Sequence, residues 1–220
     1  MKLFISLLCF LLLLGCNDPS KERKVVQTDT SVAAFSGAED VTGAVSALLP
    51  LPNSYNLKQA KKWYDQKGEN WLVLYETGSF VAQGKEFPSA KLSAVLYLKT
   101  DTGFVQQWKM NDFVNDCDLD LVCNYYDNHL SITDLDSNGI AEVMMVYALS
   151  CRGDVSPNEK KLILYEGGKK YALRGEELLI MKKDTTGGTY KPDESFKNLP
   201  ATIRDSAIKH FQKFGVTKYE

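Results

Sequence analysis

The stretch Trp71-Leu-Val-Leu-Tyr75 carries no charged side chain, and a similar run follows it at Leu92-Ser-Ala-Val-Leu-Tyr-Leu98. Both runs are short and rich in aromatic or β-branched residues, which favour strands. Four more segments share this character and are separated by Gly, Asn, Asp or Pro: Phe104–Trp108, Leu130–Thr133, Val143–Tyr147 and Leu162–Tyr165. Because helices of ten or more residues are missing between them, the sequence predicts a mainly β fold, an antiparallel β-meander.

Three further elements are expected around these strands. The segment Tyr165–Tyr171 predicts a hairpin, because Gly167-Gly168 supplies the positive φ that a tight turn needs. A C-terminal helix packed on the sheet is predicted after Pro200, which suits a first helical turn. A short helix is also predicted at Leu57–Asp65. The apolar residues of the C-terminal helix recur at spacings of four, four and three: Ile203, Ala207, Phe211 and Phe214.

The overall composition is that of an ordinary globular protein. The chain has 220 residues, of which 44% are hydrophobic and 25% are charged, and these values exclude collagen-like and wholly disordered proteins. Its 26 basic and 28 acidic residues give a net charge of −2. A nucleic-acid-binding protein usually shows a basic excess, so we expect no nucleic-acid partner.

The N-terminus resembles that of an exported lipoprotein. The run Leu3–Leu14 is apolar except for Ser6, and it is too short to span a bilayer as a helix, so it predicts a signal peptide. Gly15-Cys16 resembles the bacterial lipobox, in which the cysteine receives acyl chains such as palmitate. The alternative is an ordinary signal peptide with another cleavage point. The prediction divides the chain into a signal peptide (1–15), a lipidated flexible tether (16–35) and a single β-rich domain (36–220).

Export and lipidation have two consequences. Acyl chains would hold the protein at the membrane, so we expect an outer-membrane lipoprotein in the periplasmic or the surface-facing leaflet. The compartment would also be oxidising. Cys9 would leave with the signal peptide and Cys16 would carry the lipid. The three remaining cysteines, Cys117, Cys123 and Cys151, allow one disulfide, and their spacing leaves the pairing open.

The acidic loop, Asp134 to Glu142, is the sharpest chemical signal. Oxygen ligands recur at positions one, three, five, seven and nine, and Gly139 at position six permits a sharp turn. An EF-hand is excluded because Met145 stands where that motif needs a glutamate. The segment is similar to the β-hairpin calcium loops of integrin-type FG-GAP repeats. The ligands expected for Ca²⁺ are Asp134, Asp136, Asn138, the backbone carbonyl of Ile140, and Glu142.

Three other interpretations of the acidic residues stay open. The loop can be a metal-free turn in which Asp and Asn side chains bond to their own backbone. The wider segment from Met110 to Cys151 has no Lys or Arg, so its carboxylates can form a solvated acidic face. The alternative to a binding function is a glycan-processing enzyme that uses acidic residues of the segment 112–142. No motif singles out a catalytic residue. The acidic residues of this segment are Asp112, Asp116, Asp118, Asp120, Asp127, Asp134, Asp136 and Glu142.

Several short blocks occur in an order that resembles one family of proteins. From about Trp71 to Gly175 the chain is similar to small lipoproteins of the Bacteroidota that are associated with surface polysaccharide biosynthesis. The resemblance implies that Cys117 pairs with Cys151, which leaves Cys123 as the extra thiol. It covers roughly half the chain and rests on Tyr75–Ser79, Asp116-Cys117, Thr133–Asp136, Asn138-Gly139, Glu142-Val143, Asp154–Pro157, Lys161–Ile163 and Lys170–Gly175.

Together these features predict a cell-envelope lipoprotein that acts as a binding or structural factor, with a Ca²⁺-stabilised hairpin. The partners expected are the membrane, through the lipid, and a glycan or another envelope protein. The resemblance implies a pathway, surface polysaccharide biosynthesis, and no particular chemistry.

Overall fold

A computed structural model describes residues 34–49, 54–182 and 184–219. The signal peptide, Cys16 and nearly all of the tether lie outside these ranges. Phe35, the last residue assigned to the tether, packs against the main core. The described fold is mainly β with antiparallel sheets and a C-terminal helix, so the predicted fold class is confirmed.

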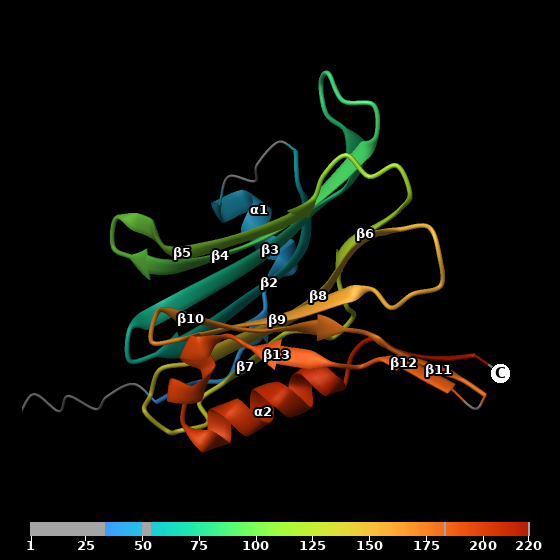
Figure 1. Cartoon of the computed structure of the whole chain (residues 1–220). Coiled ribbons are helices and arrows are strands. Elements are labelled where there is room, and N and C mark those ends of the chain that lie inside the picture. The colour runs from blue at the N-terminus through green and yellow to red at the C-terminus, as the bar shows by residue number, and fades with distance from the viewer. Residues whose placement is uncertain (1–33, 50–53, 183, 220) are drawn as a thin grey trace, which may run out of the picture. The chain divides into compact units, whose positions relative to one another are not determined.

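The first five strands form one antiparallel meander, called sheet A here (Figure 1). Each strand pairs with its neighbour in the chain, and short turns join the strands from β2 to β5, as expected for an antiparallel meander. The helix α1 (Thr42–Leu48) follows the first strand and packs on the outer face of the sheet. The strands are β1 (Glu39–Asp40), β2 (Asn56–Asp65), β3 (Gly68–Val81), β4 (Pro88–Thr100) and β5 (Gly103–Val114).

Sheet B follows along the chain, in the strand order β13-β10-β9-β8-β6, with β7 paired to one end of β8. The predicted hairpin joins β9 to β10, and Gly167 and Gly168 have φ values of +56° and +85°. The strands are β6 (Asp120–Tyr125), β7 (Ser131–Thr133), β8 (Glu142–Arg152), β9 (Glu159–Glu166), β10 (Lys169–Glu176) and β13 (Tyr190–Pro192).

The predicted helix at Leu57–Asp65 is wrong, because this segment is strand β2. Lys, Gln and Ala are good helix formers, but intrinsic propensity is a small energetic term that tertiary context overrides. As a strand, the segment turns Trp63 into the core between the sheets and Ala60 toward α1 on the other face. The strand places these two side chains on opposite faces, because side chains alternate along it.

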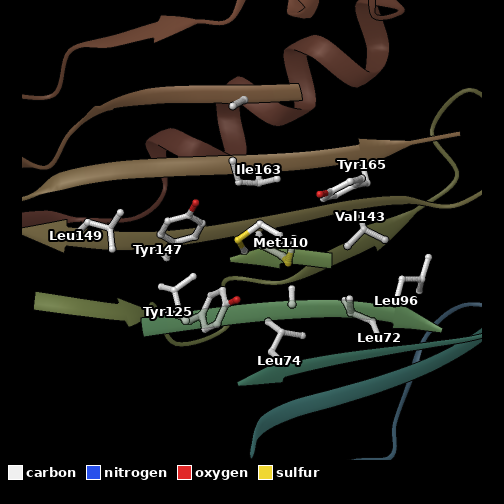
Figure 2. Close-up of a cluster of buried hydrophobic side chains, with 14 of the residues drawn as sticks. Leu72, Leu74, Leu96, Met110, Tyr125, Val143, Tyr147, Leu149, Ile163 and Tyr165 are labelled. Atoms are coloured by element: carbon white, nitrogen blue, oxygen red, sulfur yellow. The ribbon is translucent and has the colours of Figure 1, made fainter. Parts of the chain in front are cut away.

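The main core lies between sheets A and B (Figure 2). Leu72, Leu74 and Met110 from sheet A meet Tyr147 and Ile163 from sheet B. Strand β8 is buried on both faces. Its odd-numbered residues from Val143 to Leu149 face this core, while Met144 and Val146 face the other side of sheet B. A strand covered on both faces has a continuous apolar run, and this explains the strand signal at Val143–Tyr147.

The predicted C-terminal helix is confirmed as α2 (Ala201–Gln212), which begins directly after Pro200. Ile203, Ala207 and Phe211 face sheet B, and Phe214 packs with them although it follows the helix. The 3₁₀ helix η1 (Glu194–Asn198) adds Phe196 to the same core. A small third sheet contains β11 (Leu178–Met181), β12 (Asp184–Gly187) and β14 (Val216–Tyr219), and its β11–β14 pair is parallel.

Candidate metal centre

The acidic loop is the connection of a β-hairpin. Strands β7 and β8 pair with Thr133 opposite Glu142, so the ends of the loop are held side by side. Ser137 and Gly139 have φ values of +57° and +77°, and these two left-handed residues fold the loop back on itself. The strands predicted on each side of the acidic loop are therefore present.

The hairpin brings three carboxylates together. Asp134, Asp136 and Glu142 each offer an oxygen, and these oxygens lie within 4.8 Å of one another. None of the ion pairs formed by described residues involves these carboxylates. Like charges at this spacing repel one another unless water or a cation neutralises them. The cluster can hold a metal ion.

Glu142 is the most buried member of the cluster, with 0% of its surface exposed. Burial raises the pKa of its carboxyl above the ordinary value, and the nearby charge of Asp136 adds to this effect. Hydrogen bonds act in the opposite direction. The Glu142 carboxylate accepts the backbone N–H of Leu135, at 2.9 Å to Oε2, and the hydroxyl of Thr133 at 3.1 Å.

Asp134 has one satisfied oxygen and one without a partner. Its Oδ2 accepts the backbone N–H of Gly139 at 3.1 Å. Its Oδ1 is buried and has no hydrogen-bond partner in the described part of the protein. A buried oxygen without a partner is costly, so this atom is a natural ligand for a cation or an ordered water.

The other two predicted ligands, Asn138 and Ile140, lie in the same turn. Asn138 Oδ1 accepts the backbone N–H of Ile140 at 2.8 Å. Its Nδ2 donates to Asp136 Oδ2 at 3.0 Å and to Glu166 Oε1 at 3.3 Å. These bonds are the pattern of the metal-free turn. The Asn138 side chain is exposed, and turning its Oδ1 toward a cation would break its bond to the N–H of Ile140.

The structure also places a neighbour beside the loop that sequence reasoning missed. The β2–β3 turn, Gln66 and Lys67, comes from sheet A, and Gln66 N donates to Gly139 O at 2.8 Å. Asp65 Oδ2 accepts the backbone N–H of Ala141 at 3.3 Å. More than seventy residues separate these partners, and no spacing in the sequence signals such a contact.

Two other carboxylates of the acidic segment, those of Asp112 and Asp116, are paired with lysines. Asp112 Oδ2 accepts Lys161 Nζ at 2.8 Å and the hydroxyl of Tyr147 at 2.9 Å. Asp116 pairs with Lys85 at 2.9 Å. The cations come from outside the segment, so the stretch without Lys or Arg is neutralised in part by residues remote in the sequence.

The cysteines form one disulfide. Cys117 is bonded to Cys151, which is the pairing that the family resemblance implies. Cys123 is buried and free, and burial raises the pKa of its thiol to about 12, with the charge of Asp112 adding to this effect. A thiol of this kind is protonated and inert at neutral pH.

A small cavity lies beside the loop, between the two sheets. Its volume is about 80 Å³, and its lining includes Trp63, Asp65, Trp108, Ile140 and Tyr165. Small-molecule sites usually measure roughly 300–1,000 Å³. The Trp108 and Tyr165 rings stack on each other with centroids 3.8 Å apart, so these aromatic residues serve the core.

Comparisons with known protein families, with curated proteins and with solved structures find no match for this chain. Among the described residues, no helix has both the length and the apolar character required to cross a membrane.

Proposed function

We propose that this protein is a Ca²⁺-binding lipoprotein of the cell envelope that acts as a binding or structural factor. The observation that carries the proposal is the convergence of Asp134, Asp136 and Glu142 with no paired cation among the described residues. Carboxylate and carbonyl oxygens are the ligands that Ca²⁺ prefers. Asn138 Oδ1 and the carbonyl of Ile140 would complete the ligand set after a small rearrangement of the turn.

The envelope assignment rests on Cys16 and the apolar run before it, and the role in surface polysaccharide biosynthesis rests on the family resemblance alone. Both stay predictions. Ca²⁺ reaches millimolar levels outside cells, where sites of modest affinity, with Kd of about 10⁻⁴–10⁻³ M, are useful. A hairpin of this affinity would be loaded in the envelope.

Thermal unfolding tests the calcium site directly. A ligand that binds only the folded state stabilises it by about 2.7 kcal/mol at a hundredfold excess over Kd. For a protein of this size, that free energy raises the melting temperature by roughly 5–10 °C. We therefore expect the protein to melt several degrees higher in about 10 mM Ca²⁺, ten times the weak end of the expected Kd range, than in excess chelator.

Two variants separate binding at this loop from general effects of charge. Asp134→Ala should abolish the rise in melting temperature, because it removes a ligand and its buried, unpartnered oxygen. Asp118→Ala changes an exposed aspartate of the same acidic segment and should keep the full rise. Equal melting temperatures of the wild-type protein in chelator and in Ca²⁺ would show that the hairpin is a metal-free turn.

A further inference from the structure

Gln66 contacts the acidic loop through both its backbone and its side chain. Its backbone N–H donates to the carbonyl of Gly139 at 2.8 Å, and its Nε2 donates to the carbonyl of Asn138 at 2.7 Å. These two carbonyls lie between the predicted ligands at loop positions five and seven. Gln66, in the turn between two strands of sheet A, therefore holds the part of the loop that carries the predicted ligands Asn138 and Ile140.

Asp65 supports the loop two residues further on, at Ala141. It is 3% exposed, and its Oδ2 accepts the N–H of Ala141 at 3.3 Å and the indole N–H of Trp63 at 3.0 Å. Its Oδ1 accepts the N–H of Lys67 at 2.8 Å, which fixes the β2–β3 turn itself. The backbone of the loop is thus bonded to sheet A from Asn138 to Ala141.

The side-chain contact of Gln66 depends on a glycine at position 139, because a larger residue would displace the flexible Gln66 side chain. A Cβ atom added to Gly139 would lie 2.7 Å from Cδ and Cγ of Gln66, which is closer than real side chains approach. Gly139 therefore allows the turn to reach the loop, in addition to adopting a positive φ.

We infer that the β2–β3 turn positions the acidic loop for its cation, and that Gln66 is a positioning residue of the site. This inference rests on the proposed Ca²⁺ function. An EF-hand holds its loop between two helices, whereas this hairpin is braced by a turn from the opposite sheet. Binding and bracing are linked reciprocally: if the contact lowers the cost of arranging the ligands, a bound cation strengthens the contact between the sheets.

The test compares Gln66→Met with wild-type protein by calorimetric titration of the full chain with Ca²⁺. Methionine matches the length of glutamine but lacks the Nε2 donor, and Gln66 is exposed, so the core is untouched. We expect a roughly three- to tenfold higher Kd, the range for losing one ordinary hydrogen bond. The control is Gln107→Met, because Gln107 is also exposed but donates its side-chain hydrogen bond to Val105 of its own strand and not to the loop.

A spectroscopic readout separates positioning from a merely structural role. During the titration, the side-chain amide signals of Gln66 in NMR spectra should shift with the same midpoint as the loop amides, while those of Gln107 stay in place. A structural role alone would lower the melting temperature in chelator and leave Kd unchanged.

The possible outcomes are distinct. Wild-type binding with an unchanged Kd in Gln66→Met, or with Gln66 signals that do not respond, would overturn the inference and leave the proposed function intact. Absence of Ca²⁺ binding by the wild-type protein would overturn both.

Discussion

At the residue scale, Gly139 has a positive φ and lies close to the Gln66 side chain, and both features favour glycine at this position. Its φ of +77° lies in the left-handed region, and its α-carbon faces the Gln66 side chain without room for a Cβ. Gly167 offers a useful comparison, since its φ is +56° and nothing lies within 4 Å of an added Cβ. The two glycines share the conformational requirement and differ in the close contact.

Gly139→Ala should therefore cost more stability than Gly167→Ala. A left-handed alanine costs about 1–2 kcal/mol, which is the whole expected loss at Gly167. At Gly139 the displaced Gln66 side chain also loses a hydrogen bond, so we expect about 2–3 kcal/mol. Chemical denaturation of the two variants in chelator measures both values, and equal losses would show that the Gln66 contact contributes nothing.

His129 makes stability depend on pH. Burial lowers the pKa of its imidazole to about 4, and the charges of Lys58 and His210 act in the same direction. The ordinary pKa is about 6.5, so the unfolded chain gains a proton as the pH falls through 6.5, whereas folded His129 gains it only near 4. The stability that neutral His129 contributes is present above pH 6.5 and is lost progressively as the pH falls to 4.

Replacing His129 by Phe keeps a ring stacked on Tyr125, where the two centroids are 4.6 Å apart, and removes the titrating group. Denaturation between pH 7 and pH 5 should show a shallower loss of stability in His129→Phe than in the wild-type protein. The lost hydrogen bond to the carbonyl of Tyr126 shifts stability equally at each pH, so only the slope is informative. Parallel pH profiles would contradict the assignment.

At the scale of the elements, the disulfide joins the connection between β5 and β6 to the end of β8. Its two cysteines are 34 residues apart in the chain. The closed loop contains β6, β7 and the acidic loop, so the covalent bond and the hairpin register constrain the same part of sheet B.

Reduction of this disulfide should lower the free energy of unfolding by about 3–4 kcal/mol, the chain-entropy value for a loop of this length. Denaturation with and without reductant measures the difference. Cys123→Ser should keep this difference, because Cys123 is free, while Cys151→Ser should remove it. A linkage through Cys123 in non-reducing peptide maps would refute the pairing.

At the scale of the whole molecule, two sheets pack face to face, and each outer face carries a helix. The acidic loop and the β2–β3 turn meet where the two sheets come together, so a cation in the loop would act on the contact between sheets. The lipid predicted at Cys16 would determine where the molecule resides.

Cys16→Ser should release the protein into the soluble fraction, because acyl chains add about 0.8 kcal/mol of membrane affinity for each buried methylene. Cell fractionation at high salt, with mass spectrometry of the N-terminal peptide, measures the change. Cys9→Ser, inside the predicted signal peptide, is the matched control and should leave the protein at the membrane. Membrane pelleting of Cys16→Ser would disprove the anchor.

The sequence alone determined the fold class and the chemistry of the candidate site. Runs such as Trp71–Tyr75 and Leu92–Leu98 form strands because their apolar side chains are continuous and their boundaries carry turn residues. The acidic loop could also be predicted from a local pattern. Asp134, Asp136 and Glu142 lie within nine residues, so one hairpin is enough to bring them together.

Tertiary structure alone decided the features that depend on distant partners. Leu57–Asp65 is a strand because pairing with β3 and burial of Trp63 outweigh weak helical preference. The exposed residues Val216–Tyr219 have no strand pattern of their own, and they are extended because β11 supplies parallel hydrogen bonds. Gln66 reaches the acidic loop across 72 residues of chain. The local sequence pattern of a segment indicates which of its side chains are buried. Which segments contact one another depends on how the sheets pack in the folded protein.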